Sequence, residues 1–138
     1  MKLITAISVA FTVFVASEHP NEIAKKLVEN VLDHYKNNNT EGLDKMYHED
    51  FNHDQCGTPY NKTFVIDTFI NYPTELDFSY NITNGTLDGD ELKFHITTKV
   101  NTQKDVDHAD YTAKGDDKGG YVIMSTKIAS CNVSLTSS

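Results

Sequence analysis

Eleven consecutive residues, 47–57, hold a large share of the side chains that could do chemistry. The stretch reads YHEDFNHDQCG and contains two histidines, three carboxylates and one of the two cysteines of the chain. Such a set could bind a metal, because zinc takes three or four nitrogen, sulfur or oxygen ligands that converge on it. It could also supply a general base, since the pKa of histidine lies near neutrality. The choice between these roles depends on the elements that position the side chains.

A change of periodicity divides this stretch. Thr40 can cap a short helix that runs through Tyr47, with Asp50 at the helix end, whereas residues 51–55 alternate as a strand does. One face of that strand carries Phe51, His53 and Gln55, and the other carries Asn52, Asp54 and Cys56. His48 at the helix end therefore diverges from His53 and Asp54, which predicts no metal site. His53 alone stays open to a chemical role, either as a general base or as a hydrogen-bonded histidine at a pocket mouth.

The remaining candidate residues give no enzyme signature. His95 shares a polar strand face with lysines and is expected to be exposed, and His108 lies in the acidic run 105–110. A calcium or zinc patch at His108 has no ligand motif to support it. The chain contains no G-x-S-x-G, no H-E-x-x-H and no phosphate-binding loop. We therefore expect no bound metal and no cofactor.

The elements that must position these residues begin with helices. Pro20 opens a helix over residues 20–36, in which apolar side chains recur every three or four positions. Asn61 can cap a helix over residues 62–71, and Pro73 disfavours its continuation.

Strands follow the helices. Residues 76–83 and 92–100 alternate apolar and polar side chains, and the dipeptide Asp88-Gly89 between them indicates a hairpin. Further strands are expected over residues 106–113 and 121–131. In the last strand the inward-facing residues are expected to be Val122, Met124, Thr126 and Ile128. The order predicts an α+β fold in which a curved antiparallel sheet wraps around N-terminal helices.

The chain divides into three segments. Residues 1–17 have a lysine near the start, an uncharged apolar run and small residues before a cleavage point, which is typical of a secretory signal peptide. The run is shorter than the roughly 20 apolar residues of a membrane span. Residues 18–131 are expected to form one domain and residues 132–138 a flexible tail. We therefore predict a secreted, extracellular protein without a membrane span.

The charge of the chain limits the classes of partner that it can bind, and its cysteines and sequons predict covalent modifications. The chain has no arginine, and residues 18–138 carry 11 lysines against 20 carboxylates, a formal charge of −9. Such a domain is not expected to bind nucleic acid, because phosphate binding depends on cationic side chains. In an oxidising compartment Cys56 and Cys131 are expected to form a disulfide. Five sequons could carry glycans, namely those at Asn38, Asn61, Asn81, Asn84 and Asn132.

One run of residues resembles a known superfamily. An aromatic that ends the first helix (Tyr35), a polar linker to Gly42, and Met46-Tyr47, Asp50, Phe51 and His53 form a pattern found in the nuclear transport factor 2-like, or cystatin-like, superfamily. This superfamily includes ketosteroid isomerases, scytalone dehydratases and polyketide cyclases. The chain departs from the pattern at Glu41-Gly42, where members usually place glycine before the acid. The resemblance implies a cone-shaped fold, and it is greatest to small secreted members of the kind nematodes carry.

The resemblance does not extend to the isomerase chemistry. At the positions of the isomerase tyrosine and carboxylate base this chain has Leu32 and Gln55, which can neither donate a hydroxyl proton nor abstract one. The dehydratase arrangement matches only at His53.

Taken together, the sequence predicts a non-catalytic domain that binds a small apolar ligand or a partner in a cone pocket. The expected pocket residues are Tyr35, Phe51, His53, Phe69, Tyr80, Phe94 and Met124. An isomerase- or dehydratase-like enzyme with His53 as base is the alternative, and a homodimer formed through the outer face of the sheet is a third hypothesis.

Overall fold

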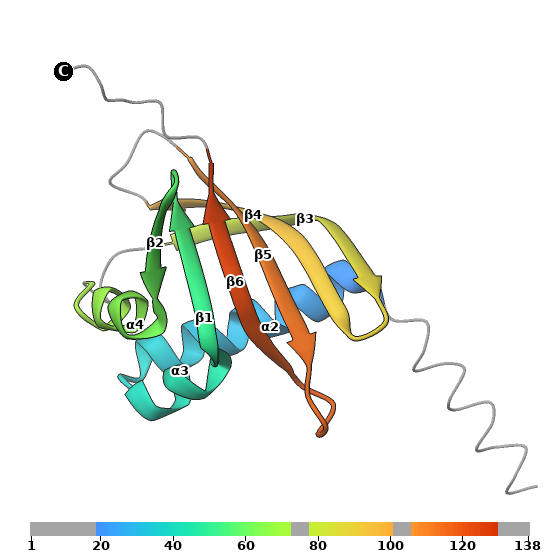
Figure 1. The fold of residues 1–138 in the computed structure, drawn as a ribbon, viewed down its shortest axis with the longest axis horizontal. Helices are drawn as coiled ribbons and strands as arrows, with labels where there is room; N and C mark the ends of the chain where they lie inside the picture. Colours follow the sequence, from blue (N-terminus) through green and yellow to red (C-terminus); the bar gives the residue numbers. More distant parts are fainter. Residues whose placement is uncertain (1–18, 73–77, 101–105, 130–138) are drawn as a thin grey trace, which may run out of the picture.

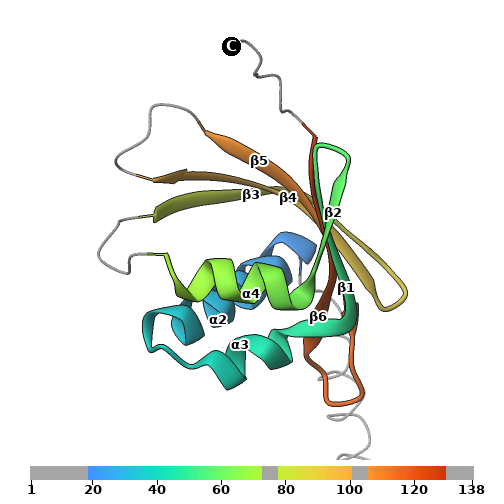
Figure 2. The same ribbon diagram turned by 60° about the vertical axis from the view of Figure 1, so that its left-hand side comes forward.

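Three helices cover one side of a curved sheet in the computed structural model, which describes residues 19–72, 78–100 and 106–129 (Figures 1 and 2). The helices are α2 (Pro20–Lys36), α3 (Thr40–Met46) and α4 (Lys62–Ile70). Each begins at a side chain that accepts a hydrogen bond from a backbone N–H of the first turn, the caps being His19, Asn39 and Asn61. Such caps satisfy N–H groups that have no partner inside the helix.

The sheet contains six strands in the order β2-β1-β6-β5-β4-β3. They are β1 (Tyr47–Gln55), β2 (Thr58–Asn61), β3 (Phe78–Asp88), β4 (Glu91–Val100), β5 (Asp107–Gly115) and β6 (Tyr121–Ile128). The α+β class and the curved sheet around N-terminal helices are confirmed. Neighbouring strands are antiparallel except β1 and β6, which pair in parallel. That pairing joins residues more than 70 positions apart, as in the contact of His53 with Thr126, and no local pattern encodes it.

The start of β1 differs from the prediction. Tyr47 and Asp50 belong to a strand and not to a helix end, because the short helix already stops at Met46. After β1 the chain makes a two-residue turn in which Cys56 has φ 56° and Gly57 has φ 95°. This turn leads into β2, an edge strand that the sequence did not predict because it contains Pro59.

A β-bulge in β6 corrects the predicted inward face of that strand. Thr112 pairs with Ser125 and Ala113 pairs with Ile123, so that Met124 is the extra residue. Ile123 is therefore 1% exposed and Thr126 6% exposed, whereas Val122 and Met124 are only partly buried. The alternation continues inward at Thr126 and Ile128 beyond the bulge, as predicted.

The core lies between the concave face of the sheet and the helices (Figure 2). Its largest fully buried side chains are Tyr35, Leu43, Leu92 and Ile123. Full burial of one such apolar side chain stabilises the fold by roughly 1.5–3 kcal/mol. A polar contact fixes the start of α2 to β3, where the Asn21 side-chain oxygen accepts a hydrogen bond from the Gly85 N–H at 2.8 Å.

Several predicted features lie outside the described residues. These are the signal peptide, the tail, Cys131 and Asn132. In the part of the chain that is described, no helix is long and apolar enough to cross a membrane.

Candidate functional site

A cavity of about 470 Å³ lies between the concave face of the sheet and helices α2 and α4. Its lining combines aliphatic and aromatic side chains from both helices with residues from all six strands. The volume falls within the range of roughly 300–1,000 Å³ that is usual for small-molecule sites.

The structure brings four of the seven predicted pocket residues to the cavity wall, namely Phe51, His53, Phe69 and Tyr80. Gln55, which shares a strand face with Phe51 and His53, also lines the cavity. The strand alternation in β1 therefore placed these side chains on the correct face.

The other three predicted pocket residues lie elsewhere. Tyr35 and Phe94 are buried behind the wall, at 2% and 3% exposure, and Met124 is displaced by the bulge in β6. The Tyr35 hydroxyl donates a hydrogen bond to the Tyr72 carbonyl at 2.9 Å, and its ring centroid lies 4.8 Å from that of Phe69. Tyr35 thus holds the end of α4 against α2 and does not face the cavity.

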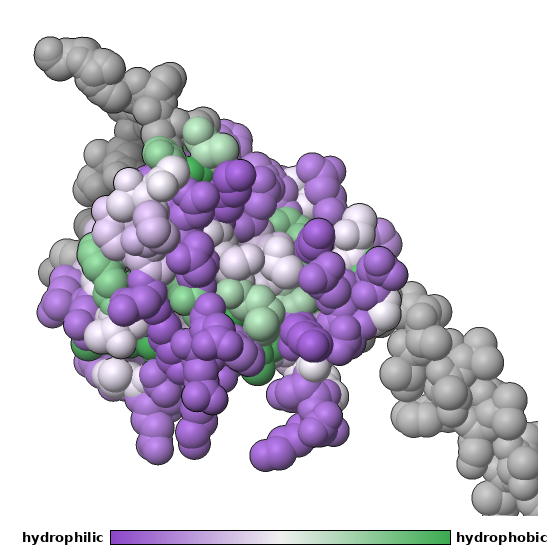
Figure 3. Space-filling model, in the orientation of Figure 1, coloured by the Kyte–Doolittle hydropathy of each residue, from purple (hydrophilic) through white to green (hydrophobic). Residues whose placement is uncertain are grey.

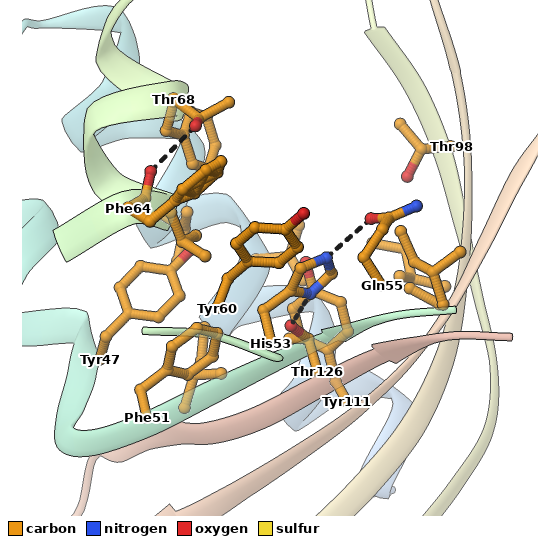
Figure 4. A pocket seen from close by; sticks show the side chains of 18 of the residues that line it. Tyr47, Phe51, His53, Gln55, Tyr60, Phe64, Thr68, Thr98, Tyr111 and Thr126 are labelled. Atoms are coloured by element: carbon orange, nitrogen blue, oxygen red, sulfur yellow. Dashed lines mark hydrogen bonds between the residues drawn. The ribbon is translucent and has the colours of Figure 1, made fainter. Parts of the chain in front are cut away.

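Further lining residues were not predicted. Tyr111 lies on the inward face of β5, and the alternation of that strand could have revealed it. Tyr47 and Tyr60 could not be found in this way, because one was assigned to a helix and the other lies on the unpredicted strand β2. Tyr60 stacks on Phe64 with ring centroids 4.4 Å apart, and Phe64 remains 45% exposed (Figure 4).

Both ring nitrogens of His53 are hydrogen bonded (Figure 4). Nε2 lies 2.9 Å from the Gln55 carbonyl oxygen Oε1, and Nδ1 lies 2.6 Å from the Thr126 hydroxyl. Because Oε1 can only accept, Nε2 carries the proton in the neutral ring, and the Thr126 hydroxyl then donates to Nδ1. The tautomer follows from these partners.

This arrangement gives His53 neutral partners. An amide and a hydroxyl hold the ring, and among the described residues that line the cavity there is no aspartate, glutamate or lysine. A general base needs an accessible lone pair in reach of a substrate proton. In His53 that lone pair already accepts the proton of Thr126, a residue that is 6% exposed.

Two tyrosine hydroxyls supply the cavity with hydrogen-bond donors. Burial raises the pKa of Tyr47 far above its ordinary value, and the neighbouring Tyr111 phenol raises it further. Burial likewise raises the pKa of Tyr111. Among the described residues neither hydroxyl forms a hydrogen bond to a protein atom. No side-chain oxygen there is both inaccessible to solvent and without a hydrogen-bond partner, so these two hydroxyl oxygens must be accessible. Both hydroxyls therefore open onto the cavity as neutral donors.

The sequence matches the family model of the NTF2-like domain over residues 21–133. No curated protein sequence matches the chain.

Solved structures show the same fold at low sequence identity. An NTF2-like protein from Cytophaga hutchinsonii superposes with a TM-score of 0.61 at 12% identity, over 80% of this chain and 97% of that chain. An NTF-2 like protein of unknown function from Silicibacter pomeroyi gives 0.63 at 14% identity, over 77% and 91%. A candidate ketosteroid isomerase from Shewanella frigidimarina gives 0.63 at 10% identity, over 76% and 93%. At such identities the likeness shows the fold alone.

Proposed function

Because the chain belongs to the NTF2-like domain family, we propose that it is a secreted, glycosylated and non-catalytic domain that binds one small, uncharged, largely apolar ligand in its cavity. The observation that carries this proposal is the composition of the cavity wall. It combines about 470 Å³ of space with apolar side chains, neutral hydroxyl donors and, in the described part, no charged partner for an ion.

The absence of charged lining residues in the described part argues for a neutral ligand. An ionised group moved from water into an apolar site loses its hydration, and only a paired charge compensates for that loss. The described lining residues offer no lysine to a carboxylate or phosphate, and the chain contains no arginine. Among the described lining residues His53 is the only one with a basic side chain, and its ring is already held by Gln55 and Thr126.

The two phenols give the ligand an orientation. Tyr47 and Tyr111 donate from the wall, so a ketone, ester or ether oxygen of the ligand would accept from them. Such a bond contributes about 0.5–1.5 kcal/mol. The apolar body of the ligand would contact Phe51, Phe69 and Ile96.

Surface features support the extracellular part of the proposal. The described sequon residues Asn38, Asn61, Asn81 and Asn84 are all exposed, as glycan attachment requires. The Cys56 N–H donates to the Ile128 carbonyl at 2.9 Å, and Cys131 follows Ile128 by three residues in the sequence. This proximity favours the disulfide between the two cysteines.

The outer sheet face bears on the homodimer hypothesis. Figure 3 views that face and shows hydrophilic side chains across much of it, interrupted by apolar ones. Asn81 alternates with the inward Tyr80 and Ile82 and so points outward. A glycan on Asn81 would obstruct a dimer through this face, so we propose a monomer.

An enzyme that uses His53 as a general base is the weaker alternative. It would need a second acid or base beside the histidine, and the hydrogen bonds of His53 go to an amide and a hydroxyl.

Binding of a matched pair of fluorescent probes tests the proposal. N-phenylnaphthylamine is neutral, and anilinonaphthalene sulfonate has the same rings with one sulfonate added. We expect saturable binding of the neutral probe at one site per chain and binding at least tenfold weaker for the sulfonate. Equal binding of both probes, or none of the neutral one, would contradict the proposal.

Two substitutions locate the bound probe. Ala109→Phe places a ring into the cavity from β5 and should abolish binding. Lys114→Phe adds the same ring at an exposed position of the same strand and should leave binding unchanged. Circular dichroism of both variants checks that the fold is retained.

A further inference from the structure

Two histidines and an aspartate form a hydrogen-bonded chain on the outer face of the sheet. His95 on β4 lies directly opposite Asp110 on β5, and its Nδ1 is 2.8 Å from the Asp110 carboxylate oxygen. The other ring nitrogen of His95, Nε2, lies 3.2 Å from Nδ1 of His108, with ring centroids 5.4 Å apart. These side chains point away from the cavity, because Phe94 and Ile96 on either side of His95 are buried in the core.

The proton positions in this chain follow from the chemistry of the partners. The Asp110 carboxylate only accepts when ionised, so the neutral His95 ring carries its proton on Nδ1. Nε2 of His95 then presents its lone pair, toward which the His108 Nδ1–H donates. A metal ion can replace that proton if His108 shifts its proton from Nδ1 to Nε2, which requires no net proton loss.

The distance between the two facing nitrogens suits metal coordination. Metal–nitrogen bonds of about 2.0–2.1 Å in a tetrahedral site place neighbouring ligand nitrogens about 3.3 Å apart. In this structure they are 3.2 Å apart. From this geometry we propose that His95 and His108 together bind one divalent ion of the Zn²⁺ or Cu²⁺ class, with water in the remaining coordination positions.

Asp110 has a distinct part in this site. It bonds to the His95 nitrogen that faces away from His108, so it cannot reach the same ion. It acts instead as a positioning residue, since a carboxylate on the far nitrogen fixes the tautomer and ring orientation of a metal-binding histidine. This agrees with the finding that no group of three potential ligands occurs among the described residues.

The ligand type selects the class of ion. Imidazole nitrogens suit zinc, copper and nickel, whereas calcium and magnesium prefer oxygen ligands. For nitrogen ligands the affinity rises toward Cu²⁺, so copper should bind more tightly than zinc. The site is independent of the proposed ligand cavity, because it lies on the opposite face of the sheet.

Calorimetry and paramagnetic resonance test the proposal on the secreted glycoprotein without an affinity tag. All proteins carry His19→Asn, because a histidine beside the predicted mature amino terminus would offer a competing site. We expect one Zn²⁺ or one Cu²⁺ per chain and a Cu²⁺ spectrum with hyperfine coupling from two imidazole nitrogens. His108→Asn and His95→Gln should each weaken binding at least tenfold and leave coupling to one imidazole at most; glutamine is used at position 95 because asparagine there would create a sequon with Thr97. His48→Asn, a matched change on β1, should have no effect.

Asp110→Ala separates positioning from coordination, and unlike asparagine it creates no sequon with Thr112. It should weaken binding by about 10–100-fold and leave two coordinating imidazole nitrogens. Stoichiometric metal binding that survives in His108→Asn would overturn the proposal. So would the absence of binding at millimolar Zn²⁺ and Cu²⁺ by the protein in which His95 and His108 are both intact. Circular dichroism confirms that each variant is folded.

Discussion

The Tyr47 hydroxyl offers a sharp test because its removal should weaken ligand binding without destabilising the fold. Among the described residues it bonds to no protein atom, so Tyr47→Phe leaves no polar group unsatisfied. We expect the free energy of unfolding at pH 7 to stay within about 1 kcal/mol of the original value or to rise. Tyr35→Phe is the matched control, because it removes a hydroxyl that donates to the Tyr72 carbonyl at 2.9 Å. That control should lose about 1 kcal/mol or more.

The same variant predicts a change at alkaline pH. The pKa of Tyr47 and that of Tyr111 are raised in the folded protein, chiefly by burial, from the ordinary value of 10.0. Above pH 10 the unfolded chain loses these protons while the folded chain keeps them, so stability falls as pH rises. Each phenol contributes up to about 1.4 kcal/mol per pH unit to this loss. Tyr47→Phe should reduce the slope by about that amount.

Urea denaturation at a series of pH values from neutral to strongly alkaline measures both effects. Binding of a neutral fluorescent probe that carries a ketone oxygen gives the third readout, with weakening of about 2–10-fold expected. The reasoning would be refuted if Tyr47→Phe destabilised the protein at pH 7 as much as Tyr35→Phe does. An unchanged alkaline slope would refute the buried position of the phenol.

Three further substitutions probe the fold around the cavity, each followed by urea denaturation. Thr126→Val removes the hydroxyl 2.6 Å from Nδ1 of His53 and should lower the free energy of unfolding by about 1–3 kcal/mol. Thr126→Ser keeps the hydroxyl and should retain most of the stability. Equal losses of stability in the two variants would show that the hydroxyl is not the stabilising group. Gly85→Ala would bring a Cβ to 2.9 Å from the Asn21 backbone nitrogen and should cost about 1–3 kcal/mol, so an unchanged midpoint would disprove that close approach. Cys56→Ser should lower the free energy of unfolding by about 2–5 kcal/mol through loss of the predicted disulfide. If the variant is less stable than the original protein by the same amount under reducing conditions, the disulfide is not the cause.

Local patterns were sufficient to predict most of the elements. Capping residues and helical spacing located α2 and α4 within a residue or two, and the Asp88-Gly89 dipeptide marked the β3–β4 hairpin. These features depend on neighbours within a few positions in the sequence. The parallel pairing of β1 with β6 depends on residues that meet only in the folded chain, so it could not be predicted.

The site was predictable where the strand period was unbroken. In β1 the alternation placed Phe51 and His53 on the cavity side correctly. In β6 a single extra residue reversed the alternation, so that Ile123 and not Met124 faces inward. The His95–His108 contact was not predicted, because it joins residues at diagonal positions on two neighbouring strands. Taken singly, each histidine has the pattern of a surface residue.

Native mass spectrometry of the protein secreted by eukaryotic cells tests the central claim most directly. We predict one small, neutral molecule held non-covalently by the glycosylated chain, which organic solvent releases. The adduct should persist in Lys114→Phe and be lost in Ala109→Phe, whose ring occupies the cavity. A chain that carries no adduct and does not take up the neutral probe would contradict the account, as would an adduct that survives in Ala109→Phe.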